Sequence, residues 1–326
     1  MKVNNKLMVQ SYLVTSARYN FSVYEKRILY RLVEICQAQL EGQKLNANFH
    51  INPYLYDDTK EVIMPISAFL KDEKDENYTI VKKALEDLNN KVIKYEDDDV
   101  WKPMRIIEMP KFFKKGYVRF VLHKEIHDAI LDFSKGFRKY ELKTAFEFES
   151  IYSMRFYELL SGKKEPITYT LDDLKIMFNL EHKYKETKDF VRRVVEPAQS
   201  ELKDRAPFSF EYKPNTIRKK IVSITFHTYE IKENKDPELE EKTLKKQTSV
   251  SWDLDKMIVN YLKENYLFET DEIKHNRDLF VDAHKELDLM NFLAKKRRIA
   301  HEKKNPKGYL VGALKRELNS VLKGEN

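Results

Sequence analysis

Glycine, cysteine and long apolar runs are scarce in this chain of 326 residues. None of its seven glycines forms a GxGxxG, GxxxxGKS or GxxxxGKT loop, the turns that bind phosphate in dinucleotide and nucleotide enzymes. The single cysteine, Cys36, cannot form an intramolecular disulfide, so we expect it to pack as a small apolar side chain in a reducing compartment. No run approaches the roughly 18 apolar residues of a membrane-spanning helix, and the N-terminus lacks a signal-peptide pattern. These absences argue against a Rossmann enzyme or an ATPase and predict a soluble, cytoplasmic protein with no membrane partner.

Metal-binding and nicking motifs are also missing. His123 and His127 stand four residues apart, but Lys124 occupies the position where zincins place their glutamate base. None of the eight histidines forms the His-hydrophobe-His triplet that a rolling-circle nickase combines with a nucleophilic tyrosine. We therefore expect no catalytic residue, no metal and no cofactor, in a protein that is not an enzyme.

Basic residues exceed acidic ones. Sixty Lys and Arg stand against 53 Asp and Glu, which gives a net charge of +7 and an isoelectric point near 9.0. This excess favours a polyanionic partner. Hydrophobic residues make up 42% of the chain, and 326 residues suffice for two domains and an appendage at roughly 100 to 150 residues per domain. The composition thus predicts a folded, basic protein of more than one domain.

The first half of the chain has the element order of a winged helix. Residues 22–40 place apolar side chains on one helical face and charged ones on the other, and Ser22 with Glu25 has the pattern of a capping box. A short helix from Pro65 and a helix over residues 77–90 follow. Three runs rich in β-branched and aromatic residues come next, at residues 92–95, 101–109 and 117–122. Three helices followed by strand hairpins predict a winged helix.

The same order repeats in the second half. A helical stretch over residues 143–161 breaks near Ser150, and a short strand over residues 167–169 follows. Thr170 caps a helix over residues 171–178, Thr187 opens a second one, and two strands at residues 208–213 and 221–229 flank a basic wing at residues 214–220. We read this order as a second winged helix.

The predicted fold class is therefore α+β, with two tandem winged-helix domains and a C-terminal helical appendage. The expected domains are an N-terminal winged helix at residues 1–136 and a second one at 137–232. A solvated linker or frayed helix follows at 233–249, and the appendage occupies 250–326, with helices at 252–266, 276–304 and 306–322.

Basic residues gather at the two places where a winged helix meets DNA, the second helix of its helix-turn-helix and the wing. The candidates on the helix are Lys185, Thr187, Lys188, Arg192 and Arg193. Those on the wing are Lys213, Arg218, Lys219 and Lys220. An arginine on the helix could read guanine, whereas the wing lysines would contact phosphates. The alternative is that these are ordinary solvated charges. Pro197 should bend or break this helix, unless it marks the helix end.

The candidates in the first domain are Asn77, Tyr78, Lys82 and Lys83. The acidic run at residues 97–99 would repel phosphate, so this wing could face protein or solvent instead. Phe112 and Phe113, close to lysines in a later turn, could contact DNA or simply pack. In the appendage, the basic residues at 295–298 and 303–304 could add nonspecific DNA affinity or form a solvated face.

Several blocks resemble the theta-type, iteron-binding plasmid replication initiators, a family with tandem winged-helix domains. They are residues 5–29, the run Tyr152–Leu160, and the block from Tyr184 through Arg192-Arg193-Val194-Val195 to Glu201-Leu202. Tyr12 departs from the family's small polar residue. The resemblance covers roughly residues 4–230 and leaves the appendage open.

The resemblance implies a protein that binds repeated origin sites as a monomer and its own operator as a homodimer. It also implies partners in the host initiator and helicase. The remaining alternative is a dimeric transcriptional repressor without replication activity.

Overall fold

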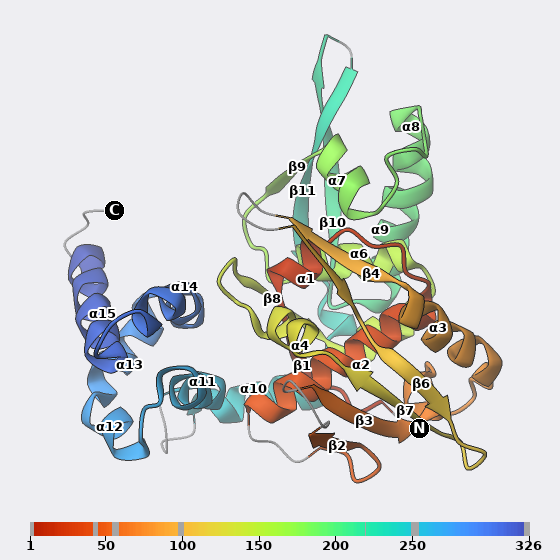
Figure 1. Ribbon diagram of the computed structural model, residues 1–326. Helices are drawn as coiled ribbons and strands as arrows, with labels where there is room; N and C mark the ends of the chain where they lie inside the picture. Colours follow the sequence, from red (N-terminus) through yellow and green to blue (C-terminus); the bar gives the residue numbers. More distant parts are fainter. Residues whose placement is uncertain are drawn as a thin grey trace.

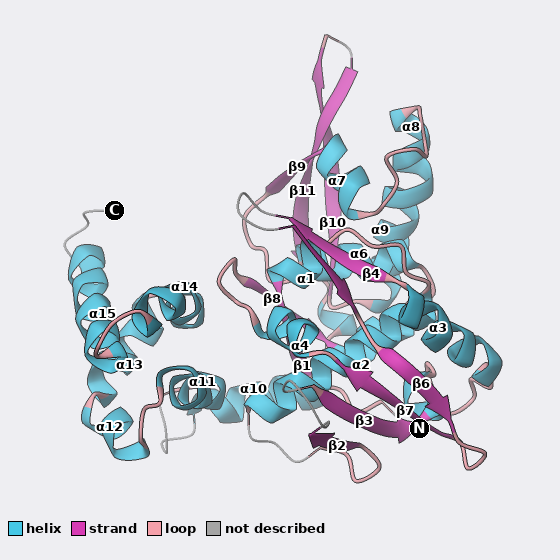
Figure 2. Cartoon of the chain, viewed as in Figure 1, coloured by secondary structure: helices cyan, strands magenta, loops and turns pink. Residues whose placement is uncertain are grey.

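The computed structural model describes residues 3–41, 45–53, 59–96, 101–218, 220–248 and 254–322, and the chain forms three units (Figures 1 and 2). Two units combine helices with antiparallel strands, and the third is built from helices. Among the described residues, no helix is long and apolar enough to span a membrane.

The N-terminal unit contains the expected helices and hairpins, together with further strands and short helices that we did not expect. Its elements are β1 (Leu7–Ser11), α1 (Tyr12–Ser16), α2 (Val23–Leu40), β2 (His50–Pro53), β3 (Lys60–Pro65), η1 (Ile66–Phe69), α3 (Tyr78–Asn90), β4 (Val92–Glu96), β5 (Trp101–Arg105), β6 (Glu108–Phe112), β7 (Tyr117–Leu122) and α4 (Lys124–Leu131). A four-stranded sheet has the order β2-β3-β7-β6, and β4 pairs with β5. The unexpected β3 pairs with β7 along its whole length and buries Val62 and Met64.

Helix α2 crosses the middle of the molecule and is buried on nearly all sides (Figure 1). The predicted capping box at its start is confirmed. The charged face that lies opposite the apolar one does not meet solvent, because the following residues are all buried: Glu25, Lys26, Arg27, Arg31 and Glu34. The second unit covers part of that face, where the Arg27 guanidinium donates to the carbonyls of Phe146 and Phe148. The first unit covers the rest, where Arg31 donates to the carbonyl of Ala68. A helix enclosed by two domains needs no outward polar face.

The second unit repeats the winged-helix order. Its elements are β8 (Phe137–Glu141), α5 (Leu142–Glu147), α6 (Ile151–Leu160), β9 (Ile167–Thr170), α7 (Leu171–Met177), α8 (Thr187–Phe190), η2 (Val191–Val195), α9 (Glu196–Arg205), β10 (Phe208–Ile217) and β11 (Lys220–Glu230). The sheet order is β10-β11-β9, and Thr170 caps α7 as predicted. Strand β8 pairs with β1, so the first and second units share a two-stranded sheet. The fold is α+β with two tandem winged-helix domains, as the sequence predicts.

The third unit is helical. Its last helix has the expected bounds 306–322, whereas the other two expected helices are shorter or divided. Its elements are η3 (Lys232–Asn234), α10 (Pro237–Thr248), α11 (Lys256–Tyr266), α12 (Thr270–His275), α13 (Arg277–Glu286), α14 (Leu289–His301) and α15 (Pro306–Leu322). The single helix expected over residues 276–304 is wrong: Asp288 accepts the N–H of Asn291 and starts a new helix there. Much of the expected linker is the helix α10. The unit shares a core with Val9, Leu40 and Phe133 of the N-terminal unit.

Candidate nucleic-acid interface

The second helix of the helix-turn-helix runs continuously through α8, η2 and α9. Its predicted apolar stripe is confirmed, because Phe190, Val194, Ala198 and Leu202 are fully buried. Residues Val191–Val195 form a π-helical turn, in which the N–H of Glu196 bonds to the carbonyl of Val191. The chain stays helical through Pro197, and the irregularity expected from this proline takes the form of the π turn just before it. Such turns occur frequently at functional sites.

The predicted basic residues of this helix lie on its outer surface. Lys185, Lys188 and Arg193 are exposed, and no ion pair joins them to a carboxylate within the described residues. Arg192 differs, because its guanidinium lies 2.8 Å from Asp189 Oδ1 in an exposed ion pair. An exposed pair of this kind contributes less than about 1 kcal/mol, so a phosphate or a base can displace it. Thr187 is the first residue of α8 and is half-buried.

The wing is a longer hairpin than expected. The basic segment 214–220 was predicted to connect the two strands as the wing, but β10 extends to Ile217 and β11 begins at Lys220, so most of this segment belongs to the strands. Lys213, Arg218 and Lys220 are exposed, whereas Lys219 lies outside the described residues. In Figure 1 the hairpin and α8 project from the same end of the molecule. The structure thus brings the two predicted basic groups together at one end.

The candidates of the first domain lie at the start of α3. Lys82 and Lys83 are exposed, and Tyr78 is 44% exposed, whereas Val81, Ala84 and Leu85 are buried on the other face. The Asn77 side-chain amide donates to Asp75 Oδ1 at 2.7 Å and is therefore already engaged. The acidic run at residues 97–99 lies outside the described residues. Near the later turn, Lys111 lies over the exposed ring of Phe113, and Phe112 is half-buried.

The two spaced histidines lie beside different partners. His123 Nε2 lies 3.0 Å from Glu108 Oε2, and His127 Nε2 lies 3.1 Å from Lys60 Nζ. Within the part of the chain that the structure describes, no three His, Cys, Asp or Glu side chains are grouped so as to hold a metal ion.

A buried ionic network joins the two winged helices, and the sequence patterns did not reveal it. Lys26 on α2 contacts both carboxylate oxygens of Glu158 on α6, and both side chains are fully buried. Gln10 also donates to Glu158, at 2.8 Å. Arg155 donates to the carbonyls of Ala17 and Met177, which belong to different units. This network fixes the second helix-turn-helix against the first unit. Its sequence signal was the charge inside the apolar run Tyr152–Leu160.

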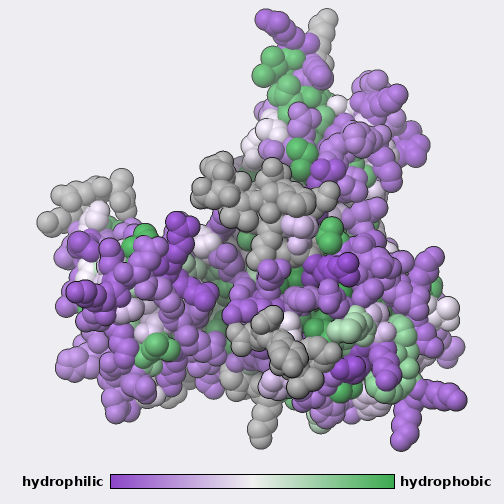
Figure 3. All heavy atoms as spheres, in the orientation of Figure 1, coloured by the Kyte–Doolittle hydropathy of each residue, from purple (hydrophilic) through white to green (hydrophobic). Residues whose placement is uncertain are grey.

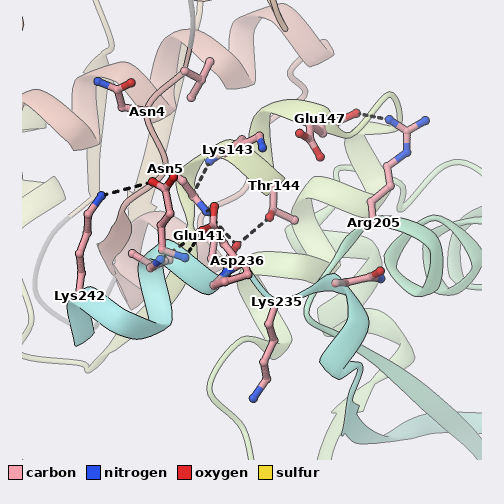
Figure 4. Close-up of a pocket in the computed structure, with 15 residues that line it drawn as sticks. Asn4, Asn5, Glu141, Lys143, Thr144, Glu147, Arg205, Lys235, Asp236 and Lys242 are labelled. Carbon is pink, nitrogen blue, oxygen red and sulfur yellow. Dashed lines mark hydrogen bonds and ion pairs between the residues drawn. The ribbon is translucent and has the colours of Figure 1, made fainter. Parts of the chain in front are cut away.

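A polar cavity of about 760 Å³ lies where α10 meets both winged helices (Figure 4). The Asn5 side-chain amide donates to Glu141 at 3.2 Å and to Asp236 at 2.8 Å. Burial raises the pKa of the Glu141 carboxyl above its ordinary value, although hydrogen bonds from Asn5 and Thr144 oppose this shift. The hydrogen bonds of Asn5 at this cavity thus connect the start of α10 to the first residues of the chain.

Charge is segregated within the third unit. Residues 254–288 contain five Lys or Arg and nine Asp or Glu, whereas residues 289–316 contain nine Lys or Arg and one Glu. Lys295, Arg298 and Lys304 of the basic part are exposed, and no ion pair engages them within the described residues. The basic patch predicted from the sequence is therefore largely free of carboxylate partners. It belongs to α14 and to the turn before α15.

These elements define a tandem winged-helix protein with an exposed basic end. Sequence models described as "Initiator Replication protein, WH1" and "Initiator Rep protein, WH2" match residues 7–161 and 170–228. The chain belongs to this family of initiator Rep proteins. The N-terminal match runs beyond residue 136 and includes α5 and α6. The domain boundaries given above stay predictions.

Two known proteins resemble the chain. A replication initiation protein of Escherichia coli is 25% identical over 198 residues, which cover 57% of this chain and 58% of that protein. The chain thus spans less than two thirds of the length of this relative. The crystal structure of the Pi initiator protein in complex with iteron DNA matches with a TM-score of 0.51 and 16% identity, over 70% of this chain and 99% of that one. This second likeness shows the shared fold.

Proposed function

We propose that this protein initiates plasmid replication by binding repeated origin sites, or iterons, in double-stranded DNA. The observation that carries this proposal is the set of exposed cations at α8 and η2, beside a projecting basic wing. Within the described residues no ion pair engages Lys185, Lys188 or Arg193, and Arg192 forms only an exposed pair with Asp189. The second helix of a helix-turn-helix lies in the major groove, and lysines and arginines around it neutralise phosphates. The Pi initiator, which has a similar fold, was solved with iteron DNA, and this supports the choice of target.

In this proposal the second winged helix is the main reader of DNA. Lys188, Arg192 and Arg193 contact the groove or its phosphates, and Lys213 and residues 218–220 hold the backbone. The first winged helix contributes a half-site contact and a homodimer surface, and the monomer and dimer are in equilibrium. The dimer binds the operator of its own gene. The protein recruits the host initiator and helicase in the cytoplasm, and it acts by binding, without a chemical step of its own.

A gel-shift titration tests the proposal. The probe is the DNA flanking the protein's own gene, with competitor DNA present and at two salt concentrations. The proposal requires discrete complexes that survive competition. Smeared complexes that dissociate at the higher salt concentration and show no preference among fragments would contradict the proposal. They would indicate a basic protein that binds DNA without sequence specificity.

A dimeric repressor without replication activity is the second candidate, because autorepression needs the same winged helices. A plasmid that carries only the origin, with the protein supplied in trans, separates the two functions. Replication of this plasmid supports the initiator. Metal-dependent cleavage of supercoiled DNA would instead indicate a nicking enzyme, and we expect none.

A further inference from the structure

The tip of the wing carries an exposed apolar side chain. Ile217 is 62% exposed and is the last residue of β10. The sequence patterns identified the basic residues around Ile217 but not Ile217 itself. Its sequence signal is an isoleucine within a basic segment. A single exposed apolar residue is ordinary on a protein surface, so the argument depends on how the wing holds this one.

The wing is a braced arm that ends in a bent, strained tip. Its base is a three-stranded sheet as far as Ser223, which pairs with Thr170 of β9, and beyond this point only β10 and β11 continue. Asn215 braces the start of this two-stranded part by donating to the hydroxyls of Ser223 and Thr225. Ser223 pairs with Asn215 and Ile221 with Thr216, which leaves one extra residue in β11 and forms a β-bulge. Bulges of this kind re-aim the side chains beyond them.

The turn itself has an unusual backbone. Arg218 has a φ of 48°, in the left-handed region that arginine rarely adopts and that hairpins usually assign to Asn or Gly. Strained residues of this kind cluster at functional sites. Figure 3 shows hydrophobic surface reaching out along the projecting hairpin toward its tip, where the protein core offers no contact.

The charge around the tip identifies the partner. Residues 212–229 contain no Asp or Glu, and four Lys or Arg lie between residues 213 and 220. A purely apolar docking surface for another protein would not need this ring of cations. An apolar side chain surrounded by phosphate-binding cations fits the edge of a DNA groove, where isoleucine and other apolar wedges part neighbouring base pairs.

We propose that Ile217 is such a wedge: it enters the minor groove of the bound duplex, partly unstacks one base step and kinks the DNA there. Arg218 and Lys220 hold the flanking phosphates while Ile217 is inserted. Pyrimidine–purine steps such as TpA unstack most easily, so the kink falls on one of them. The inference rests on the proposed function, and it adds a local distortion of the duplex to site recognition.

The experiment compares wild-type protein with Ile217→Ala and Ile217→Leu on one fragment, the DNA flanking the protein's own gene. A competitor-resistant gel shift measures binding, circular permutation of the site measures bending, and permanganate measures unstacked thymines. The control is Leu267→Ala, because Leu267 is 71% exposed but lies in the helical third unit. Ile217 lies outside the core, so these variants keep the wild-type melting temperature.

We expect wild type, Ile217→Leu and Leu267→Ala to bend the fragment by about 20° or more and to expose one thymine to permanganate at each site. Ile217→Ala should bind within about threefold of wild type and lose most of both signals. A second variant, Arg218→Gln, should bind more weakly but keep the permanganate signal at saturation, because it removes a phosphate contact and leaves the wedge.

Two results would overturn the inference. If Ile217→Ala binds, bends and exposes the thymine as wild type does, Ile217 is not a wedge. If wild type forms competitor-resistant complexes on straight, fully stacked DNA, the wing does not distort the duplex at all. Failure of wild type to form any such complex is a different outcome, because it refutes the proposed function itself.

Discussion

Lys26 Nζ lies 2.8 Å from Glu158 Oε1, and neither side chain is reached by solvent. The pair joins α2 of the first winged helix to α6 of the second, and the Lys26 ammonium also donates to the Tyr19 hydroxyl at 2.6 Å. Its enclosure means that the two winged helices are held together through the centre of the molecule. The angle between them is therefore set by the fold and not by a flexible connection.

Removing one partner of this pair should destabilise the protein strongly. Lys26→Met leaves Glu158 buried without its counter-ion, a change that costs about 3 to 5 kcal/mol. Lys71→Met is the matched control, because Lys71 and Glu149 lie 2.8 Å apart at the exposed surface. This control should lose less than about 1 kcal/mol. Urea unfolding of both variants measures the difference, and equal losses would contradict the central role of the buried pair.

Arg192→Ala should weaken specific binding more than nonspecific binding. A bidentate contact to guanine contributes about 1 to 3 kcal/mol of discrimination, which is about 5- to 150-fold in affinity. Releasing Arg192 from Asp189 costs little, because the pair is exposed. Lys220→Ala is the comparison, and it should weaken both kinds of binding alike. Competition titrations measure both affinities. An equal loss of specific and nonspecific affinity in Arg192→Ala would make this residue a phosphate contact.

The basic patch on α14 should add salt-dependent affinity if it meets the DNA beside the bound site. Replacing Lys295, Arg298 and Lys304 by Gln removes up to three phosphate contacts, which lowers the slope of log affinity against log salt by up to about 2.7. Replacing Lys256, Lys274 and Lys285 by Gln changes the net charge equally, but in the acidic part of the same unit. The same slope in both triple variants would show that the patch is a solvated face.

Glu141 should make stability fall as pH rises. Its pKa is raised in the folded protein, first by burial, so folding favours the protonated form. This contribution is complete below the unfolded pKa of about 4.3 and is lost as pH rises through the folded pKa. Glu141→Gln stays neutral, so it should gain stability relative to wild type between pH 4 and pH 7.

Glu149→Gln gives the opposite sign and serves as the control. A hydrogen bond and the charge of Lys71 lower the pKa of Glu149, so its contribution is present above the unfolded pKa and is lost in acid. This variant should therefore lose stability relative to wild type at pH 7 and approach it toward pH 3. Urea midpoints at these pH values measure both variants. A loss for Glu141→Gln between pH 4 and pH 7 would contradict the raised pKa.

Local patterns were sufficient to predict most helices and both hairpin groups, because caps and apolar stripes are encoded within a few residues. Ser22 and Thr170 both start helices as expected. Burial of Lys26 was not predictable in this way, since the surface that covers it comes from α6, far along the chain. From the sequence alone, such a residue has the position of one on the polar face of an amphipathic helix.

The candidate site shows the same limit. Runs of lysine and arginine pointed to the second helix of the helix-turn-helix and to the wing as the candidate site. The length of the wing and the pairing of Arg192 with Asp189 depend on three-dimensional contacts. The division of the helix expected over residues 276–304 is different, because Asp288 was a visible capping residue. The expected single helix passes over this residue, whereas in the structure the Asp288 side chain caps a new helix.

The most direct test of the central claim is the number of complexes formed on fragments with one, two or three copies of the repeat beside the protein's own gene. If each winged-helix pair reads one repeat, the count of shifted, competitor-resistant species rises in step with the number of repeats, and a scrambled fragment of equal length gives none. The same complexes on the scrambled fragment would contradict sequence-specific binding of repeated sites.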